Sequence, residues 1–257
     1  MSKLATAERV SKDASDNFVY ARSLLAYVYA SQAVTGELLE IGTGSGYGVE
    51  TLAQSATKYT TVDKYQPIRE ITPQNTTFVE ATVPPLPFED ESFDSALSFQ
   101  VIEHIKDDKA FVREVSRVLR PGGKFILSTP NAPASLTRNP WHVREYTAEE
   151  LDALVGEYFE IESRCGVFGN DKVMEYYTKN RDSVKAITRY DVLNLQYRLP
   201  RWMLQIPYDI ANRLNRKRLL NKNRELTTSI KMDDYSVAPL DNGGDVAFDL
   251  LYILRKK

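Results

Sequence analysis

Glycines crowd the segment from Leu38 to Gly48, where the sequence is LLEIGTGSGYG. An apolar run of strand character leads directly into Gly42, Gly44 and Gly46. Glycine lets the backbone approach a ligand closely, and the start of a following helix favours polar or anionic groups. The segment therefore predicts a loop that binds a nucleotide-like ligand.

An acidic residue follows this loop at a spacing typical of ribose recognition. Asp63 ends the next apolar segment, 21 residues after Gly42, in the sequence TTVDK. A carboxylate there lies beside the glycine loop and can accept hydrogen bonds from both ribose hydroxyls. The fingerprint G-x-G-x-x-G would need glycine where this chain has Tyr47, and the Gly-Lys-Ser/Thr of a P-loop is absent. These departures argue against a nicotinamide, flavin or P-loop site.

The elements that must position these residues alternate between short apolar runs and stretches of helical spacing. Parallel strands need crossover connections, so this alternation predicts a doubly wound α/β fold with a seven-stranded, mostly parallel sheet. A turn is expected at residues 241–244 because of the sequence DNGG. We expect strands over 37–41, 58–62, 76–80, 94–99, 123–128, 158–164 and 245–254, and helices over 17–34, 46–55, 108–119 and 147–155.

Residues 170–244 interrupt this pattern with helical spacing and no strand signal, so they form a predicted helical insertion. Charge is uneven here: the range 181–224 holds eleven Lys and Arg against three Asp, whereas the whole chain holds 33 Lys and Arg against 35 Asp and Glu. Apolar and basic residues interleave over 197–224. That segment suits an amphipathic subdomain with a solvated basic face, a homodimer contact, peripheral membrane contact, closure over an acidic substrate or nucleic-acid binding.

Composition sets the broad class of this 257-residue, 29.2 kDa chain. With 42% hydrophobic and 26% charged residues it is an ordinary globular protein rather than a disordered one. A single cysteine, Cys165, excludes an internal disulfide and a thiolate metal cluster. The longest apolar run, residues 24–30, is far short of the roughly 18 residues of a membrane span, and the first ten residues lack the apolar core of a signal peptide. We expect a cytoplasmic protein.

Two further segments follow the glycine loop and Asp63 in the chain, and the four segments are, in order, LLEIGTGSGYG, TTVDK, LPFEDESFDSALSFQVIEHI and FVREVSRVLRPGGKFILSTPN. Together they resemble the class I S-adenosylmethionine-dependent methyltransferase family, in particular methyltransferase type 11 and the ubiquinone-pathway O-methyltransferases. The resemblance covers about residues 36–131 and the final strand. It implies a methyltransferase enzyme with a Rossmann-like fold, in which residues 1–169 and 245–257 bind S-adenosylmethionine and residues 170–244 form a lid, substrate or oligomer subdomain.

The resemblance also implies which residues hold the cofactor. The glycine loop would hold its amino acid part and Asp63 its ribose. Thr82 stands where the family often has an aspartate that contacts the adenine amine, and a threonine hydroxyl replaces that acceptor only in part. The implied cofactor residues are Glu40, Gly42, Thr43, Gly44, Gly46, Tyr47, Asp63, Lys64, Thr82, Val83 and Gln100.

Methyl transfer is an in-line displacement from a sulfonium, whose leaving group needs no protonation, so positioning supplies much of the rate. An alcohol or phenol acceptor would benefit from a general base or a metal. His104 is the candidate general base, and its neighbour Glu103 is a second candidate catalytic residue. The alternative is that both residues cap the following segment and line the pocket.

A metal site is a weaker interpretation of the same residues. The segment Gln100-Val-Ile-Glu-His104 resembles the Glu-x-x-Glu-His segment with which some family members hold a divalent metal, although the first ligand here is glutamine. His142 precedes the next predicted helix much as an additional ligand does in small-RNA 2′-O-methyltransferases. Glu103, His104 and His142 are therefore an alternative Mg²⁺ site, whereas our main interpretation has no metal.

The acceptor is expected at the carboxyl edge of the sheet, after the fifth predicted strand. Trp141, His142, Arg144 and Tyr146 form a candidate aromatic and cationic rim that suits a polar ring or a sugar, unless this loop only covers the core. The local sequence is similar to bacterial methyltransferases that act on small molecules and cell-surface sugars. We expect methylation of a hydroxyl oxygen on a small molecule or glycan; the alternatives are an RNA 2′-O-methyltransferase, which the acidic balance elsewhere disfavours, and a non-catalytic cofactor-binding or assembly protein.

Overall fold

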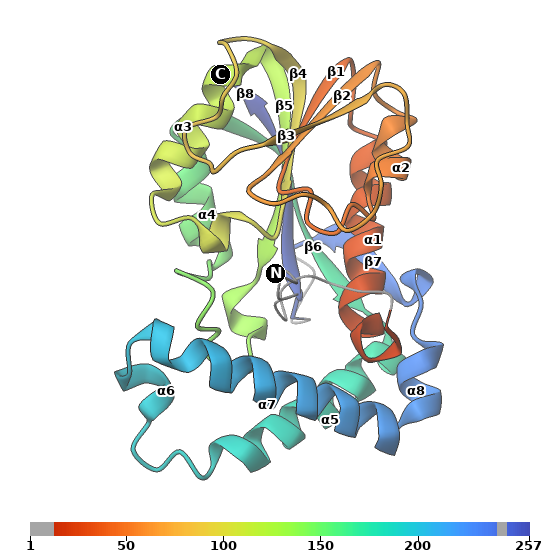
Figure 1. Cartoon of the computed structure of the whole chain (residues 1–257), viewed down its shortest axis with the longest axis vertical. Coiled ribbons are helices and arrows are strands. Elements are labelled where there is room, and N and C mark those ends of the chain that lie inside the picture. Colours follow the sequence, from red (N-terminus) through yellow and green to blue (C-terminus); the bar gives the residue numbers. More distant parts are fainter. Residues whose placement is uncertain (1–12, 241–245) are drawn as a thin grey trace.

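The computed structural model describes residues 13–240 and 246–257, whose strands form one eight-stranded sheet (Figure 1). The strand order is β3-β2-β1-β4-β5-β8-β6-β7. The first five strands in this order are parallel to one another, and the pairs β5–β8, β8–β6 and β6–β7 are antiparallel. The predicted doubly wound, mostly parallel sheet is thus confirmed. The strands are β1 (Glu37–Ile41), β2 (Lys58–Asp63), β3 (Thr76–Glu80), β4 (Phe93–Phe99), β5 (Leu119–Pro130), β6 (Phe159–Gly169), β7 (Tyr235–Pro239) and β8 (Asp249–Lys256).

Helices cover both faces of the sheet, and a group of four lies beyond one end of its strands (Figure 1). The α4 helix starts at a capping box, in which Thr147 and Glu150 each accept a hydrogen bond from the other's backbone N–H. The helices are α1 (Asn17–Ser31), α2 (Val49–Ala53), α3 (Asp108–Val118), α4 (Ala148–Val155), α5 (Asp171–Thr188), α6 (Leu195–Arg198), α7 (Arg201–Lys222) and α8 (Arg224–Ser229). Short 3-10 turns are η1 (Ala14–Asp16), η2 (Ile102–His104), η3 (Ala132–Ala134) and η4 (Met232–Asp234).

The central strands are apolar on both sides because a hydrophobic core lies against each face of the sheet. Leu38 of β1 belongs to the core beneath α1 and α2. Its neighbours Leu39 and Ile41 belong to the core beneath α3 and α4. Since successive strand residues point to opposite faces, one short strand anchors both layers.

The number of strands predicted from the sequence was wrong by one, because β7 lies within the segment expected to be wholly helical. It pairs antiparallel with β6 and forms an edge of the sheet. Only Tyr235 of its five residues is buried, and it ends at Pro239, so the continuous apolar run of a central strand is missing. The predicted turn at 241–244, and residue 245 at the predicted start of the last strand, lie outside the described residues.

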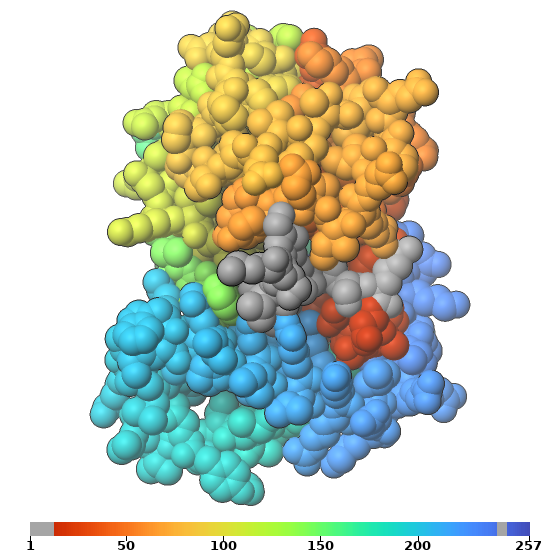
Figure 2. Space-filling model, viewed as in Figure 1, coloured from red at the N-terminus to blue at the C-terminus, as the bar shows by residue number. Residues whose placement is uncertain are grey.

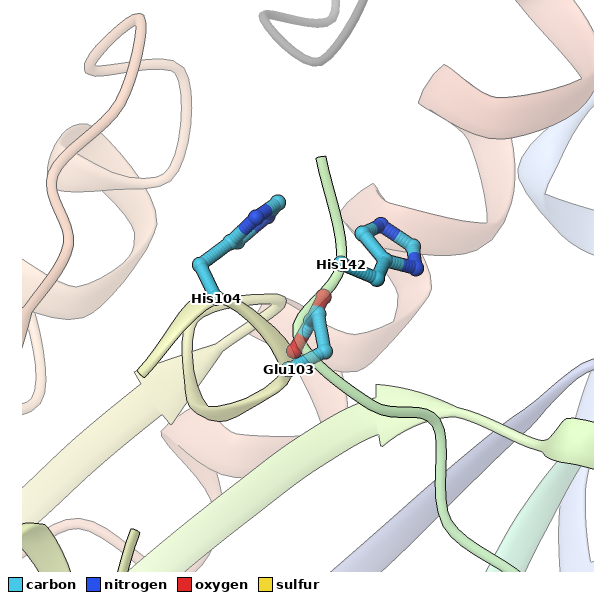
Figure 3. Close-up of side chains that lie close together, drawn as sticks. All are labelled: Glu103, His104 and His142. Atoms are coloured by element: carbon cyan, nitrogen blue, oxygen red, sulfur yellow. The ribbon is translucent and has the colours of Figure 1, made fainter. Parts of the chain in front are cut away.

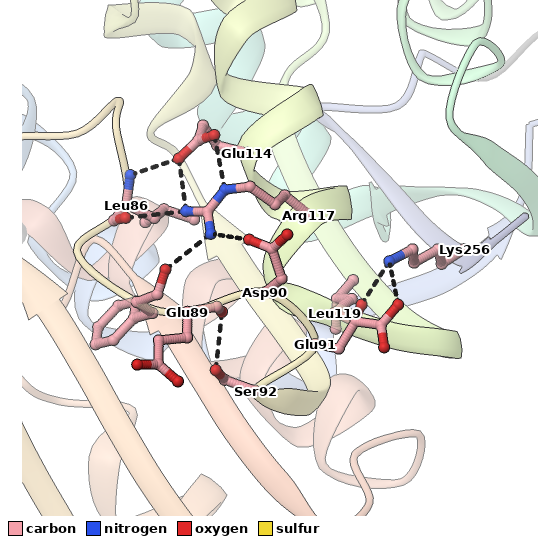
Figure 4. Close-up of polar contacts among 10 residues, drawn as sticks. Leu86, Glu89, Asp90, Glu91, Ser92, Glu114, Arg117, Leu119 and Lys256 are labelled. Carbon is pink, nitrogen blue, oxygen red and sulfur yellow. Dashed lines mark hydrogen bonds and ion pairs between the residues drawn. The ribbon is translucent and has the colours of Figure 1, made fainter.

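Arg117 of α3 fixes the loop that precedes β4 (Figure 4). Its guanidinium donates to the carbonyl oxygens of Phe88 (2.8 Å) and Leu86 (3.1 Å). It also pairs with the carboxylates of Asp90 and Glu114, each at 2.8 Å. Charge-assisted bonds of this kind are among the strongest polar contacts, so β4 enters the sheet from a firmly held loop.

The helices α5 to α8 lie beyond the carboxyl ends of the parallel strands (Figure 1). α5 and α7 contact each other through Asn215, which accepts a hydrogen bond from Ser183 (2.6 Å) and donates one to Asn180 (2.8 Å). Arg216 of α7 pairs with Asp16 near the start of α1 at 2.6 Å. Within the described ranges, no helix is long and apolar enough to cross a membrane.

Candidate functional site

A cavity of about 1350 Å³ lies between the carboxyl ends of β1, β2 and β4 and the helices α5 and α7. This volume exceeds that of a typical small-molecule site and gives room for two ligands side by side. Residues from the sheet side and from the helices line the same space. They include Gly42, Thr43, Gly44, Tyr47, Asp63, Lys64, Thr82, Val83, Gln100, Glu103, His104, Trp141 and His142, and opposite them Tyr176, Tyr177, Asn180, Tyr208, Asn212 and Asn215.

The glycine loop needs glycine for two different reasons. Gly42 has a φ of +94°, and a Cβ there would lie 2.3 Å from Cγ2 of Val101. Gly44 has a φ of +57°, but a Cβ there would meet nothing nearer than the Gly42 carbonyl oxygen at 4.0 Å. Gly42 therefore allows close packing of the loop on Val101, whereas Gly44 presents bare backbone to the cavity.

The carboxylate of Asp63 is held at the cavity wall by two backbone donors. Its Oδ2 accepts a hydrogen bond from the N–H of Gly44 (2.9 Å), and its Oδ1 accepts one from the N–H of Tyr65 (3.0 Å). The end of β2 and the loop after β1 are thereby tied together. This arrangement suits a diol, because a carboxylate has further lone pairs with which to accept hydroxyl hydrogens.

Glu40 lies beneath the loop rather than in the cavity wall. It is 1% exposed, and the hydroxyls of Tyr27 (2.6 Å), Tyr59 and Thr61 (2.9 Å) donate to its carboxylate. Burial raises the pKa of Glu40, although the three hydroxyl donors oppose that shift. Glu40 and Gly46, both expected from the sequence to touch the cofactor, are not among the cavity-lining residues. In this structure Glu40 supports the floor on which the loop rests.

Gln100 connects the cofactor side of the cavity to a buried charge pair that the sequence analysis missed. Its backbone has a φ of +56°, and its amide donates to Ser128 Oγ (3.2 Å) and to Asp249 Oδ1 (3.4 Å). Asp249 pairs with Arg22 of α1 at 3.2 Å. Burial raises the pKa of Asp249 and the Arg22 guanidinium opposes that rise. Arg22 also lines the cavity, so the first helix and the last strand both contribute to this site.

Glu103, His104 and His142 meet where β4 and β5 end (Figure 3). Their nearest ligand-type atoms all lie within 4.8 Å of one another. The Glu103 side chain is buried and accepts a hydrogen bond from Thr129 Oγ1 at 3.0 Å. His104 Nδ1 lies 3.0 Å from the Trp141 carbonyl oxygen, which can only accept, so Nδ1 carries the proton. In the neutral ring Nε2 is then the basic nitrogen.

Both ring nitrogens of His142 are engaged in hydrogen bonds. Asn139 Oδ1 accepts from the Trp141 N–H (3.0 Å), which leaves its Nδ2 to donate to His142 Nε2 at 2.8 Å. His142 Nδ1 lies 2.6 Å from Glu145 Oε1. Mg²⁺ prefers six oxygen ligands, whereas this set offers one carboxylate and two imidazoles, one of them occupied. The donor set does not fit Mg²⁺.

Two of the four residues expected to bind the acceptor turn away from the cavity. The guanidinium of Arg144 binds the carboxylate of Asp108 and the carbonyl oxygen of Lys106 (3.1 Å). The hydroxyl of Tyr146 also donates to Asp108, at 2.9 Å, and neither residue lines the cavity. Asp108, in the first turn of α3, gathers both side chains there. The structure thus leaves Trp141 and His142 as the acceptor candidates of this loop.

Trp141 joins this loop to the helices on the far side of the cavity. Its Nε1–H donates to Asp209 Oδ1 of α7 at 3.0 Å. Arg138 makes a second connection by donating to the Gln196 carbonyl oxygen of α6 at 2.9 Å. The sequence analysis missed Asp209, Asn180 and Asn212, because nothing in the helical spacing showed which face of the insertion would meet the sheet.

Comparison with known proteins agrees with these features. Residues 39–127 match the family described as "Methyltransferase domain". A "probable S-adenosylmethionine-dependent methyltransferase" of Mycolicibacterium smegmatis is 35% identical over 182 residues, which cover 66% of this chain and 70% of that protein. A protein of Mycobacterium tuberculosis with the same description is 33% identical over 191 residues, which cover 70% of this chain and 69% of that protein.

Solved structures agree on the fold. A methyltransferase structure from Thermotoga maritima superimposes with a TM-score of 0.58 at 18% sequence identity, and the match covers 97% of this chain and 98% of the Thermotoga chain. A [4+2]-cyclase superimposes with a TM-score of 0.54 at 17% sequence identity, and the match covers 91% of this chain and 80% of the cyclase chain. Since the same fold is found in a cyclase, the fold alone does not specify the reaction.

Proposed function

The chain belongs to the S-adenosylmethionine-dependent methyltransferases, and we propose that it methylates a hydroxyl oxygen of a small-molecule or glycan acceptor. One observation carries this proposal. A single cavity joins the glycine loop and Asp63 to His104 and Trp141. A methyl donor and a hydroxyl acceptor held at these two positions share one space, as an in-line displacement requires.

The cofactor half would be held by the glycine loop and the two strand ends beside it. S-adenosylmethionine supplies an electrophilic methyl group when it is bound. The bare backbone at Gly44 admits a ligand at close range, and the Asp63 carboxylate beside it suits the ribose hydroxyls. Thr82 and Val83 line the cavity where the adenine would lie, and Gln100 lies between this half and the acceptor half. The residues present therefore fit this cofactor.

The acceptor half has a base in position. His104 carries its proton on Nδ1, where the Trp141 carbonyl holds it, so Nε2 can take the proton of an acceptor hydroxyl. The oxygen becomes the nucleophile as that proton leaves. Glu103 positions this segment, because its carbonyl oxygen accepts from the Val143 N–H at 2.6 Å and its carboxylate is held by Thr129. No step of this chemistry uses Mg²⁺.

The walls of the acceptor half suit a hydroxylated ring. Trp141, Tyr176 and Tyr177 offer aromatic surface, and the amides of Asn180 and Asn212 offer both donors and acceptors. Such a mixture binds the apolar face and the hydroxyl edge of one ring at the same time. We propose that residues 170–244 act as the lid over this acceptor, with residues 1–169 and 245–257 forming the cofactor-binding unit.

The proposal is tested by an acceptor screen. Purified protein is incubated with methyl-labelled S-adenosylmethionine and sets of phenols, polyols and mono- and oligosaccharides, and the methylated atom of any product is located by NMR. We expect label on oxygen in wild type and far less with His104→Ala. A product methylated on nitrogen or carbon would contradict the assignment of a hydroxyl acceptor.

A further inference from the structure

The α7 helix has two apolar faces, and only one of them meets the rest of the protein. Leu204, Tyr208 and Asn215 point to the cavity. On the opposite face four large apolar side chains recur every fourth residue, which places them on one side of the helix. They are exposed to solvent: Trp202 by 72%, Ile206 by 72%, Ile210 by 56% and Leu214 by 63%.

Basic side chains flank these apolar residues. Arg213, Lys217 and Arg218 of α7 are all exposed, whereas Arg201 lies on the other side of the helix and donates to the Val143 carbonyl oxygen. The sequence of this helix contains one acidic residue, Asp209, and the indole of Trp141 donates to it. We call the exposed face of α7, formed by these four apolar residues and by Arg213, Lys217 and Arg218, the α7 surface. In Figure 2 the side chains of α6 and α7, coloured cyan to blue, cover much of the lower half of the molecule.

More apolar residues precede α7 in the chain. In the connection from α5, Tyr190 is 73% exposed, Val192 84% and Leu193 63%. A monomer in water rarely leaves so many large apolar side chains exposed together, and such patches mark interaction sites. α6, which follows this connection in the chain, lies at the end of the molecule where α7 begins (Figure 1).

We propose that the α7 surface docks on an anionic lipid membrane. Apolar side chains at the level of the lipid headgroups, flanked by Lys and Arg, are the pattern of interfacial helices, and the basic groups are drawn to negatively charged lipid. A second copy of this chain fits less well, because a symmetric contact uses the same patch of both copies and would bring two positively charged surfaces together. Charge therefore favours a lipid surface over self-association.

Docking would bring the cavity close to the bilayer. The lid residues of α7 and the α7 surface lie on opposite sides of one helix, and a helix with its side chains is about 10 Å thick. If the proposed methyl transfer holds, an amphipathic or lipid-linked acceptor could pass from the membrane into the site over this short distance. Membrane binding itself requires neither cofactor nor acceptor, so it can be tested separately from the reaction.

The test is flotation of the full chain with vesicles of phosphatidylcholine alone or with about one third phosphatidylglycerol. We expect binding to the anionic vesicles, at least about tenfold weaker binding to the neutral ones, and weakening of the anionic binding by high salt. The double variants Trp202→Ser with Ile206→Ser, and Arg213→Gln with Lys217→Gln, should each reduce the binding about tenfold or more. All four residues are exposed, so both variants should unfold at the wild-type temperature.

Matched controls remove equivalent groups elsewhere. Lys109→Gln with Arg113→Gln neutralises two exposed cations of α3, which lies far from α7 (Figure 1) and should leave vesicle binding unchanged. Fluorescence gives a second readout, because the chain has two tryptophans. Emission should shift to shorter wavelength with anionic vesicles, and Trp202→Phe should abolish the shift while Trp141 remains.

Three outcomes would overturn the proposal. The first is no binding to anionic vesicles by folded protein. The second is binding that the Trp202 and Ile206 double variant retains in full. The third is a dimer in solution that this double variant dissociates, without vesicle binding, which would assign the α7 surface to self-association.

Discussion

Asp63 Oδ2 accepts a hydrogen bond of 2.9 Å from the backbone N–H of Gly44, so the end of β2 and the loop after β1 form one unit. Each of these residues lines the same cavity. The contact orients the carboxylate next to the stretch of backbone at which a Cβ would meet no close neighbour. The binding surface that we assign to S-adenosylmethionine is therefore already arranged in the protein itself.

The two cavity-lining glycines should respond differently to alanine. Gly42→Ala places a methyl group against Val101 and should lower the free energy of unfolding by about 1–3 kcal/mol. Gly44→Ala should lower the free energy of unfolding by only about 1 kcal/mol, because alanine disfavours the left-handed backbone there. Its methyl group enters the cavity, however, and should weaken S-adenosylmethionine binding by more than about tenfold. Urea unfolding and calorimetric titration measure the two quantities. Wild-type affinity in Gly44→Ala would contradict the assigned position of the cofactor.

Removing the proposed base should reduce turnover without affecting the cofactor. We expect His104→Ala to lower kcat by about 10²- to 10⁴-fold, because the acceptor hydroxyl would lose its proton acceptor. The dissociation constant for S-adenosylmethionine should stay at the wild-type value. Initial rates with an identified acceptor, together with calorimetry, check both statements. Unchanged turnover in the variant would exclude His104 as the base.

A chelator separates this account from a metal mechanism. His142 already engages both ring nitrogens, and the Glu103, His104 and His142 set does not suit Mg²⁺. Methyl transfer by wild type should be equal with EDTA and with added Mg²⁺. Loss of activity in EDTA that Mg²⁺ restores would show that the metal interpretation was the correct one.

The contact between Trp141 and Asp209 should affect acceptor binding specifically. Asp209→Ala removes a hydrogen bond of 3.0 Å between the acceptor loop and α7, and bonds of this type contribute about 1 kcal/mol. The KM for the acceptor should rise about three- to tenfold, with cofactor affinity unchanged. Asp209→Asn keeps an oxygen that can accept from the indole, so its KM for the acceptor should lie close to the wild-type value. Equal KM values in wild type and Asp209→Ala would show that this contact does not hold the lid.

Buried Glu40 should make stability depend on pH. Its pKa in the folded protein is raised above the ordinary value of 4.5, mainly by burial, so the folded state binds the proton more tightly than the unfolded chain. The advantage of wild type over Glu40→Gln in free energy of unfolding should be largest below pH 4.5. It should then fall as the pH rises towards the folded pKa, by at most about 1.4 kcal/mol per pH unit. Urea unfolding at several pH values measures this, and an advantage that grows with pH would contradict it.

Local sequence predicted the elements on which the site is built. The strands that carry Gly42, Asp63 and Gln100 at their ends are short apolar runs with turn residues after them, and α4 falls within the helix predicted over 147–155. Such signals depend only on neighbouring residues. The order of the elements then indicated a parallel sheet, whose carboxyl edge holds the cavity.

Contacts between distant parts of the chain were not predictable in this way. Arg144 and Tyr146 follow His142 closely in sequence, yet both bind Asp108 of α3 and therefore point away from the cavity. Arg22 and Asp249 meet at the site from opposite ends of the chain. β7 has a partner in β6 that no local pattern reveals. In each case the deciding contact depends on tertiary packing rather than on the spacing of residues.

Calorimetric titration of S-adenosylmethionine into the purified protein tests the central claim most directly, with NAD as the control ligand and Asp63→Ala as the control variant. The account predicts micromolar binding of S-adenosylmethionine, no binding of NAD, and loss of binding in the variant, because the carboxylate beside Gly44 is assigned to the ribose. Absence of binding to folded wild type, or equal affinity in Asp63→Ala, would contradict it.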